Sequence, residues 1–153
     1  MTPLTTLDRF AIEDLFSIYH WALDTADVEG FVDTLVDDAV VVLKIGDRTS
    51  HYEGRAGMVD VAESLRVWDR FPGCQHFADQ LLIEPLADTG ERRCQVRSFL
   101  LVAECRGEPP YSLRFAGRSD DRLVFRGGQW LFEQRLVRLW QSDALCNRQL
   151  ELS

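Results

Sequence analysis

The stretch YSLRFAGRSDDRLVFRGGQWLFEQRLVRLWQ, residues 111–141, decides the fold class of this 153-residue chain. It contains two long segments in which aliphatic and aromatic residues are mixed with arginines, and Gly127-Gly128 separates them. Two such runs joined by a glycine pair are typical of a β-hairpin. The sequence therefore predicts antiparallel strands at about 111–126 and 129–141.

Further strand-like segments precede this hairpin. Clusters of Gly, Pro and Asp, such as Gly46-Asp47, Ala87-Asp88-Thr89-Gly90 and Gly107-Glu108-Pro109-Pro110, separate them as turns do. Turns this short favour a largely antiparallel sheet. The additional predicted strands cover residues 40–45, 48–53, 75–85 and 92–105.

Helices are predicted mainly before the sheet, at about 6–26, 28–36 and 55–70. In the first, Thr5 and Asp8 offer an N-terminal cap. Its apolar positions recur at spacings of three and four, and they are Ala11, Leu15, Ile18 and Ala22. Helices followed by a long meander favour an α+β fold in which a bent sheet wraps around the helices and leaves a pocket. We expect one domain over residues 1–153.

Composition narrows the function classes. The chain is 46% hydrophobic and 27% charged, with a net charge of −8, which is typical of a globular domain and argues against a nucleic-acid partner. The four cysteines lack the C-x-x-C spacing of zinc sites, no signal peptide is recognisable, and no apolar run reaches the length of a membrane span. We therefore expect a cytoplasmic protein without a membrane partner.

Two polar signatures stand in apolar surroundings. The first, residues 19–27 (YHWALDTAD), closes the first predicted helix, and the second, residues 75–80 (QHFADQ), opens a predicted strand. Together they supply a carboxylate and an imidazole that one small pocket could bring together. Such a pair can move protons without a cofactor, because the carboxylate fixes the imidazole tautomer and stabilises its protonated form.

These signatures belong to a longer pattern, which contains Ile12, Tyr19, Leu23-Asp24-x-x-Asp27, Asp37-Asp38-Ala39, Gly54, Gln75-His76-Phe77 and Gly128-x-Trp130-x-x-x-x-Arg135. The pattern resembles the SnoaL-like branch of the nuclear-transport-factor-like superfamily, which includes scytalone dehydratase, hexachlorocyclohexane dehydrochlorinase and the small subunits of aromatic-ring-hydroxylating dioxygenases. The resemblance implies a cone-shaped α+β barrel of strongly bent, mixed but mostly antiparallel sheet, usually oligomeric. It also implies catalytic roles for Asp24 and His76.

The resemblance leaves more than one function open. Scytalone dehydratase has a further histidine on its next-to-last strand, whereas residues 114–118 here contain none. The segments Gly117–Leu123, Trp130–Arg135 and Leu145–Leu150 resemble dioxygenase small subunits more closely. Such subunits are structural partners of an iron-containing large subunit.

The residues alone leave alternatives open for each candidate. A helical wheel places Asp24 on the polar side with Glu13, Ser17 and His20, which would face solvent. Strand parity places His76 with Cys74 and Ala78 but does not say which side is the cavity. His20 lies four residues before Asp24, where the two can touch, and with His76 they would form a metal-ligand set. We expect a surface pair there and no metal.

Six residues are predicted to line the substrate pocket. They are Tyr19, His20, Phe77, Arg97, Trp130 and Gln134. Gln134 is included because it shares a strand face with Trp130, Phe132 and Leu136, and it would be a polar contact for a substrate if that face lines the cavity. Arginines within strands, namely Arg97, Arg114 and Arg118, would either bind an anionic substrate group or pair across strands on the wetted face.

The sequence thus predicts a cofactor-independent enzyme for a small, mostly apolar cyclic or aromatic substrate. In this hypothesis His76 abstracts a proton and Asp24 orients it, in a dehydratase, isomerase or cyclase reaction. The alternatives are a non-catalytic dioxygenase small subunit bound to a large subunit, or a small-molecule-binding protein. We also expect a homodimer or homotrimer formed through the outer face of the sheet.

Overall fold

The computed structural model describes residues 3–67, 74–87, 90–104 and 112–140. In chain order its elements are α1 (Thr6–Thr25), α2 (Val28–Val32), β1 (Leu35–Ile45), β2 (Arg48–Glu53), α3 (Gly54–Val67), β3 (Cys74–Pro85), β4 (Arg93–Glu104), β5 (Ser112–Arg126) and β6 (Gln129–Trp140). The strands form one six-stranded sheet in the order β2-β1-β6-β5-β4-β3. All neighbours are antiparallel except β1 and β6, which are parallel.

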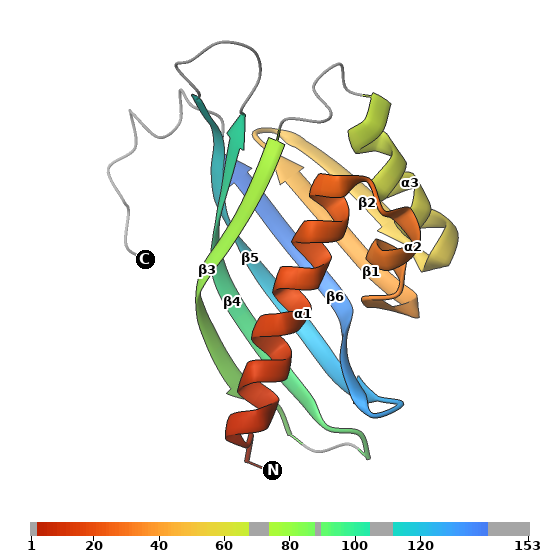
Figure 1. Ribbon diagram of the computed structural model, residues 1–153, viewed down its shortest axis with the longest axis vertical. Coiled ribbons are helices and arrows are strands. Elements are labelled where there is room, and N and C mark those ends of the chain that lie inside the picture. The colour runs from red at the N-terminus through yellow and green to blue at the C-terminus, as the bar shows by residue number, and fades with distance from the viewer. Residues whose placement is uncertain (1–2, 68–73, 88–89, 105–111, 141–153) are drawn as a thin grey trace.

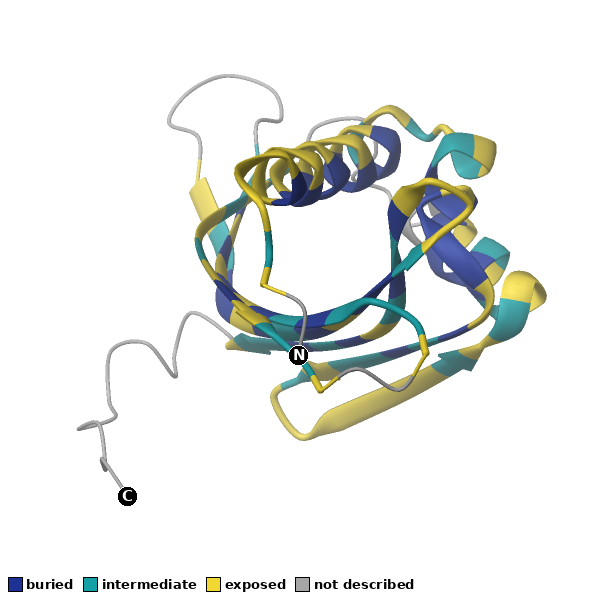
Figure 2. Ribbon diagram, turned by 90° about the horizontal axis from the view of Figure 1, so that it is seen from below, coloured by how far each residue is buried: buried dark blue, intermediate teal, exposed yellow. Residues whose placement is uncertain are grey.

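The predicted fold class is confirmed: a bent, mixed and mostly antiparallel sheet curves around α1 (Figures 1 and 2). The sheet is not closed into a barrel, because β2 and β3 are its two edges. Helix α1 covers the concave face, while α2 and α3 lie beside β1 and β2. None of the described helices is long and apolar enough to cross a membrane.

Helix α1 begins with the predicted cap. The Asp8 backbone N–H donates to Thr5 Oγ1, and the Thr5 backbone N–H donates to Asp8 Oδ2, which completes a capping box. The buried face of the helix differs from the predicted one, because Ala11 and Ile18 are exposed. The residues that α1 buries are Asp8, Ile12, Leu15, Phe16, Tyr19, His20, Ala22 and Leu23.

The chain between α1 and β1 turns sharply. Ala26 adopts a left-handed conformation with φ 59°, and the Asp27 backbone N–H donates to the Ala22 carbonyl oxygen. Asp27 then caps α2 through the Gly30 backbone N–H. The second helix is shorter than the predicted 28–36, because β1 already begins at Leu35. The predicted third helix over 55–70 is described as far as Val67.

The end of the sheet near the N-terminus is packed solid, and we call it the closed end. Asp8 is its polar centre: the carboxylate accepts hydrogen bonds from Trp130 Nε1, at 3.1 Å, and from Arg92. Burial alone would raise the pKa of Asp8, but the bonds from Arg92, Thr5 and Trp130 together hold it well below its usual range. The surrounding side chains are Ile12, Phe16, Cys94, Val96, Leu123 and Phe132, all almost fully buried.

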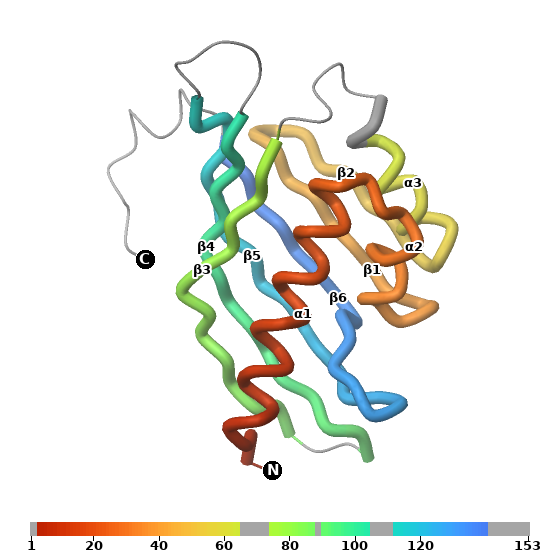
Figure 3. Tube along the Cα trace, viewed as in Figure 1, coloured from red at the N-terminus to blue at the C-terminus, as the bar shows by residue number. Residues whose placement is uncertain are grey.

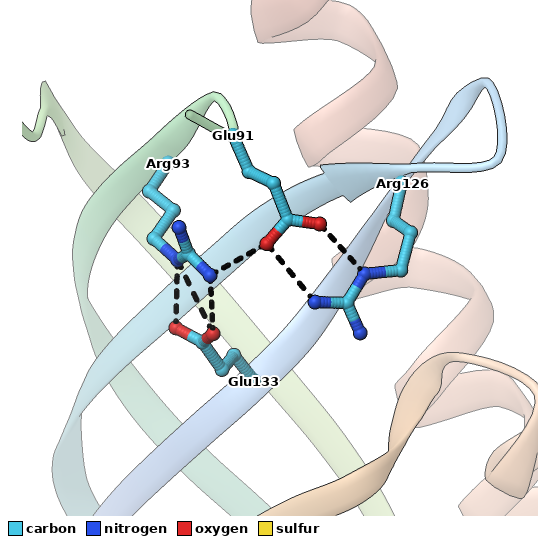
Figure 4. Close-up of polar contacts among 4 residues, drawn as sticks. All are labelled: Glu91, Arg93, Arg126 and Glu133. Carbon is cyan, nitrogen blue, oxygen red and sulfur yellow. Dashed lines mark hydrogen bonds and ion pairs between the residues drawn. The ribbon is translucent and has the colours of Figure 1, made fainter. Parts of the chain in front are cut away.

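A β-bulge in β6 separates this end from the rest of the sheet. Leu123 pairs with Phe132 but Arg122 pairs with Gln134, so Glu133 is an extra residue in β6. Arg93 Nε and Nη2 donate to the Glu133 carboxylate at 3.1–3.3 Å, and Arg93 also contacts Glu91, which binds Arg126 (Figure 4). The bulge exchanges the two faces of β6. Residues beyond it point to the face opposite the one that simple alternation predicts.

A second bulge interrupts β3. Asp79 pairs with Phe99 and Leu82 with Arg97, which leaves two residues of β3 opposite Ser98. Gln80 at this point has φ 57°, and its backbone N–H donates to Asp79 Oδ1. As a result His76 and Ile83 point to the same, concave side of the sheet although their numbers differ in parity.

Candidate active site

Beyond the bulges, the concave face of the sheet and helices α1 and α3 enclose a cavity of about 210 Å³. We call this part of the molecule the open end. It lies where the C-terminal end of α1 meets the start of β3 (Figure 1). Most of the surface of the wall is apolar, and its aliphatic side chains include Leu23, Leu43, Leu100, Val102 and Val137. A largely apolar cavity with a few polar groups is the usual form of a small-molecule site.

His76 and Asp24 form the most specific polar contact of the cavity wall. Asp24 Oδ1 accepts from His76 Nδ1 at 2.6 Å, and Asp24 Oδ2 accepts from the His76 backbone N–H at 2.8 Å. Because an ionised carboxylate only accepts, Nδ1 carries the proton and Nε2 has a free lone pair. Among the described residues, no group hydrogen-bonds this Nε2 atom. The predicted pair is therefore assembled, with the ring held in one tautomer.

The position of Asp24 resolves the conflict between the helical wheel and the resemblance. Its side chain is only 18% exposed and lines the cavity, so the solvent-facing interpretation of the wheel is wrong. The wheel fails because the buried stripe of α1 runs through Phe16, Tyr19 and Leu23. Asp24 lies in the last turn of α1, which brings its carboxylate to the start of β3.

His20 is buried beside this pair rather than on the surface. Its Nδ1 donates to the Phe16 carbonyl oxygen at 2.8 Å, and its ring stacks on the His76 ring with centroids 5.9 Å apart and an interplanar angle of 16°. The expected surface pair of His20 and Asp24 does not form, since both oxygens of Asp24 bind His76. Burial, followed by the charges of Arg135 and His76, holds the pKa of His20 well below its usual range.

A buried ion pair forms the floor of the cavity. Asp121 and Arg135 are direct cross-strand partners on β5 and β6, and Arg135 Nε and Nη2 each donate to the Asp121 carboxylate at 3.0 Å. Ser119 Oγ also donates to Asp121, so it accepts a hydrogen bond from Ser98 Oγ. Both charges are almost completely buried, so the pair places a fixed guanidinium beneath the cavity.

Tyr19 links this floor to the wall that α1 provides. Its ring lies under the Arg135 guanidinium, with the carbon Cζ 4.1 Å from the ring centroid. The hydroxyl-bearing side chain is 4% exposed and lines the cavity, as predicted. Burial raises the pKa of Tyr19, although the Arg135 charge opposes this effect. Tyr19 is therefore a neutral phenol at ordinary pH.

Two predicted pocket residues point away from the cavity. Phe77 follows His76 in β3, so its side chain emerges on the opposite face, where it is 52% exposed and lines an outer groove between α1 and β3. Arg97 also lies on the outer face, and its Nη2 donates to Glu84 in an exposed ion pair. The predicted pocket contacts of Phe77 and Arg97 are therefore wrong.

Two further predictions on β6 fail, and only the second of them because of the bulge at Glu133. Trp130 is inward-facing but belongs to the closed end, where it packs on Phe125 and donates to Asp8. It does not line the cavity. Gln134, beyond the bulge, faces outward and is exposed. The positions that face the cavity on β6 are instead Arg135, Val137 and Leu139.

The residues that sequence reasoning missed follow from the same register. Arg135 is the last residue of the Gly128-x-Trp130-x-x-x-x-Arg135 pattern, and Asp121 is its partner on β5. Regular alternation from Trp130 would place Arg135 on the outer face. Only knowledge of the bulge in β6 would have placed both residues inward. Tyr52 and Ser50 reach the cavity from β2. Of the three strand arginines considered above, Arg114 lines the cavity and binds Glu104, whereas Arg118 is exposed.

The donor groups do not form a metal centre of the kind that the sequence left open. Within the described ranges, no three His, Cys, Asp or Glu side chains are grouped so that they could hold a metal ion. Cys74 lines the cavity and Cys94 is buried in the closed end, while Cys105 and Cys146 lie outside the described residues. Burial raises the pKa of the Cys94 thiol to about 12.

Comparison with known proteins places this geometry in a family. The family described as the SnoaL-like domain matches residues 5–136. No curated protein matches the chain. Solved structures do. A protein from Novosphingobium aromaticivorans, provisionally described as a scytalone dehydratase, is 25% identical, with a TM-score of 0.70 over 87% of this chain and 84% of its own.

Two other similar structures show the fold alone. One is the beta subunit of a provisionally assigned aromatic-ring-hydroxylating dioxygenase, also from Novosphingobium aromaticivorans, with 17% identity and a TM-score of 0.72 over 88% of this chain and 90% of its own. The other is ActVI-ORFA from Streptomyces coelicolor, with 20% identity and a TM-score of 0.72 over 88% and 98% of the two chains.

Proposed function

The chain belongs to the SnoaL-like domain family, and on that premise we propose that it is a cofactor-independent acid–base enzyme for a small, mostly apolar cyclic or aromatic substrate. His76 abstracts a proton from carbon, and Asp24 orients the ring and balances the positive charge that it acquires. The reaction is a dehydration, isomerisation or cyclisation. The observation that carries the proposal is the double hydrogen bond of Asp24 to His76, which leaves Nε2 as a base at the cavity.

The rest of the cavity supports this chemistry. Its aliphatic wall excludes water from a bound ring, which strengthens every electrostatic interaction inside. The buried Arg135 guanidinium below the cavity stabilises negative charge that develops on the substrate as the proton leaves. Tyr19, whose ring packs on that guanidinium, contacts the substrate from the α1 side.

The experiment measures proton abstraction directly. Cyclic ketones and enones are incubated with the protein in D₂O, and exchange at the α-carbon is followed by NMR, while polycyclic alcohols are screened for loss of water. We expect His76→Ala and Asp24→Asn to lower the rate by about 10² to 10⁴, the usual contribution of a general base. The double variant should be little worse than the more damaging single variant, since the two residues act as one unit.

The matched control is His51→Ala, which removes an exposed histidine that lies outside the cavity. It should retain the wild-type rate. Activity that survives in His76→Ala protein with an unchanged circular dichroism spectrum would eliminate the acid–base mechanism. The small-molecule-binding alternative would then account for the cavity.

Homo-oligomer formation is the second part of the proposal. The outer face of the sheet carries an apolar row that crosses four strands in register, formed by Phe77, Leu101, Ala116 and Trp140. Phe99 adds a further exposed ring beside it. We expect this face to bind a second copy of the chain, giving a dimer or trimer. Static light scattering at micromolar concentration measures the mass, and a monomer would contradict the expectation.

The same face could serve the alternative function, that of a dioxygenase small subunit. One of the similar structures is the beta subunit of a provisionally assigned dioxygenase, and such a subunit needs a surface that binds its large subunit. In that case Phe77, Leu101 and Trp140, the exposed members of this row, would bind a large subunit and the cavity would need no chemistry. The two functions differ in the exchange assay. A folded wild-type protein that exchanges no substrate proton, but forms a stable complex with a Rieske-type large subunit, would favour the subunit over the enzyme.

A further inference from the structure

His20 is a second histidine of the cavity that the proposed proton abstraction does not use. It is 7% exposed and lines the same cavity as His76. Its Nδ1 atom contacts the Phe16 carbonyl oxygen at 2.8 Å. A carbonyl oxygen can only accept, so Nδ1 carries the ring proton and Nε2 carries a lone pair. The helix therefore fixes the tautomer of His20, as Asp24 fixes that of His76.

The Nε2 atom of His20 remains available to a ligand. In the part of the chain that the structure describes, no group hydrogen-bonds it, and it is not one of the side-chain atoms that are sealed from solvent. The neighbouring wall is apolar, with Leu23, Leu100 and Val102 also lining the cavity. A ligand that donates a hydrogen bond to an acceptor in such a wall binds more tightly. A ligand without a donor binds more weakly, because it displaces the water that would bind the acceptor.

The charges around His20 keep it an acceptor throughout a reaction. The guanidinium of Arg135 faces it from β6, and the His76 ring stacks on it from β3. Tyr19 contacts it edge-on and stays neutral, while the Asp24 carboxylate is committed to His76. Once His76 takes up a proton, its charge disfavours a second proton on His20. His20 therefore has no proton on Nε2 to donate.

We propose that His20 Nε2 accepts a hydrogen bond from a hydroxyl group of the substrate, so that the cavity selects hydroxylated cyclic or aromatic compounds over their ethers and deoxy counterparts. This inference takes one point from the proposed function, namely that the substrate binds in this cavity. His20 is thus a specificity-determining residue, distinct in role from the base. A site with an acceptor for a hydroxyl discriminates against ligands that lack one.

The test is a binding experiment that needs no turnover. Isothermal titration calorimetry measures the Kd of 5-, 6- and 7-hydroxy-1-tetralone, of their methyl ethers and of 1-tetralone. For the wild type we expect at least one hydroxytetralone to bind about tenfold more tightly than both its ether and 1-tetralone, which is the usual net gain of one hydrogen bond. Because binding is measured without turnover, this outcome is separate from any failure of catalysis.

Two substitutions of His20 separate its ring nitrogens. An asparagine places an amide near Nδ1, so His20→Asn retains a donor for the Phe16 carbonyl oxygen but removes the acceptor at the cavity. In His20→Asn we expect the hydroxytetralone, its ether and 1-tetralone to bind with about equal Kd, while the Kd of 1-tetralone stays at its wild-type value. A glutamine amide reaches the Nε2 position, so His20→Gln should keep part of the preference. His20→Phe, which keeps a planar ring, replaces the asparagine variant if circular dichroism shows that variant unfolded.

His51→Ala is the matched control, because it removes an exposed histidine that lies outside the cavity. It should leave the preference intact. The inference is overturned if the wild type binds no probe or binds all alike, or if His20→Asn keeps the preference. It is also overturned if the His20 variants weaken all probes equally, which indicates a structural role. A preference lost in His51→Ala as well would show that the loss is not specific to His20, and would also overturn the inference.

Discussion

The closed end and the open end of this molecule use the same elements in opposite ways. At the closed end α1 meets the sheet through a continuous core around Phe16 and Phe132, and the polar groups of Asp8, Arg92 and Trp130 bind one another. At the open end the same helix and sheet leave a cavity, and His76 and His20 each present an unused nitrogen. Figure 3 shows α1 running from one end to the other. Stability and chemistry are thus separated along one helix.

The bulges mark the border between the two ends. The extra residues in β3 and β6 increase the local twist and exchange the strand faces. Because of the bulge at Glu133, Trp130 and Arg135 both point inward although five positions separate them. One faces a packed core and the other the floor of a cavity. Strand β6 therefore supplies the core residue Trp130 to the closed end and the charged residue Arg135 to the open end.

Truncation of one side chain at each end gives the largest expected difference in stability. Trp130→Ala removes a ring that is 3% exposed together with its bond to Asp8, and should lower the free energy of unfolding by about 3 to 5 kcal/mol. His76→Ala, at the wall of an existing cavity, should lower it by less than about 1 kcal/mol. Urea denaturation measures both values. Equal losses would mean that the cavity end is packed as tightly as the closed end.

The sequence allowed the elements to be predicted better than the faces they present. Turn residues such as Gly127-Gly128 placed most strand ends within a residue or two of those observed, but β1 begins at Leu35, five residues before the predicted start at 40. The face of α1 was assigned wrongly because Ala11 and Ile18, which are apolar, lie on its exposed side. Apolar side chains are common on protein surfaces. When they lie all around a helix, as in α1, their spacing does not say which face is buried.

The candidate site shows the same limit more sharply. Asp24 and His76 are 52 residues apart in the sequence but hydrogen-bond to each other in the fold. The resemblance to the SnoaL-like branch was the feature that assigned catalytic roles to both. Gln134 was predicted by regular alternation, which the extra residue Glu133 invalidates. The extra residue binds Arg93 of β4, which is forty residues away in the sequence, so no local pattern in β6 reveals the contact. Tertiary contacts decided the orientation.

The two ends should also respond to different ranges of pH. The pKa of Asp8 is lowered in the folded state, so its contribution to stability is complete above the unfolded value, about 3.9, and is lost as the pH falls below it. The pKa of His20 is lowered as well, but from about 6.5. Its contribution therefore begins to be lost at a much higher pH.

This difference gives the smallest expected effect, a change of slope. Below about pH 6.5 the unfolded chain binds a proton at His20 that the folded protein does not, so the free energy of unfolding falls by up to about 1.4 kcal/mol per pH unit from this residue alone. His20→Asn should make the decline between pH 6.5 and 5 shallower by up to that amount. Asp8→Asn, the control from the closed end, should lower stability but leave the slope in this range unchanged, because Asp8 is ionised in both states there. Urea denaturation at half-unit pH intervals measures the slopes. An unchanged slope in His20→Asn would show that His20 is free to take up a proton in the folded protein, and the open end would then lack its fixed acceptor.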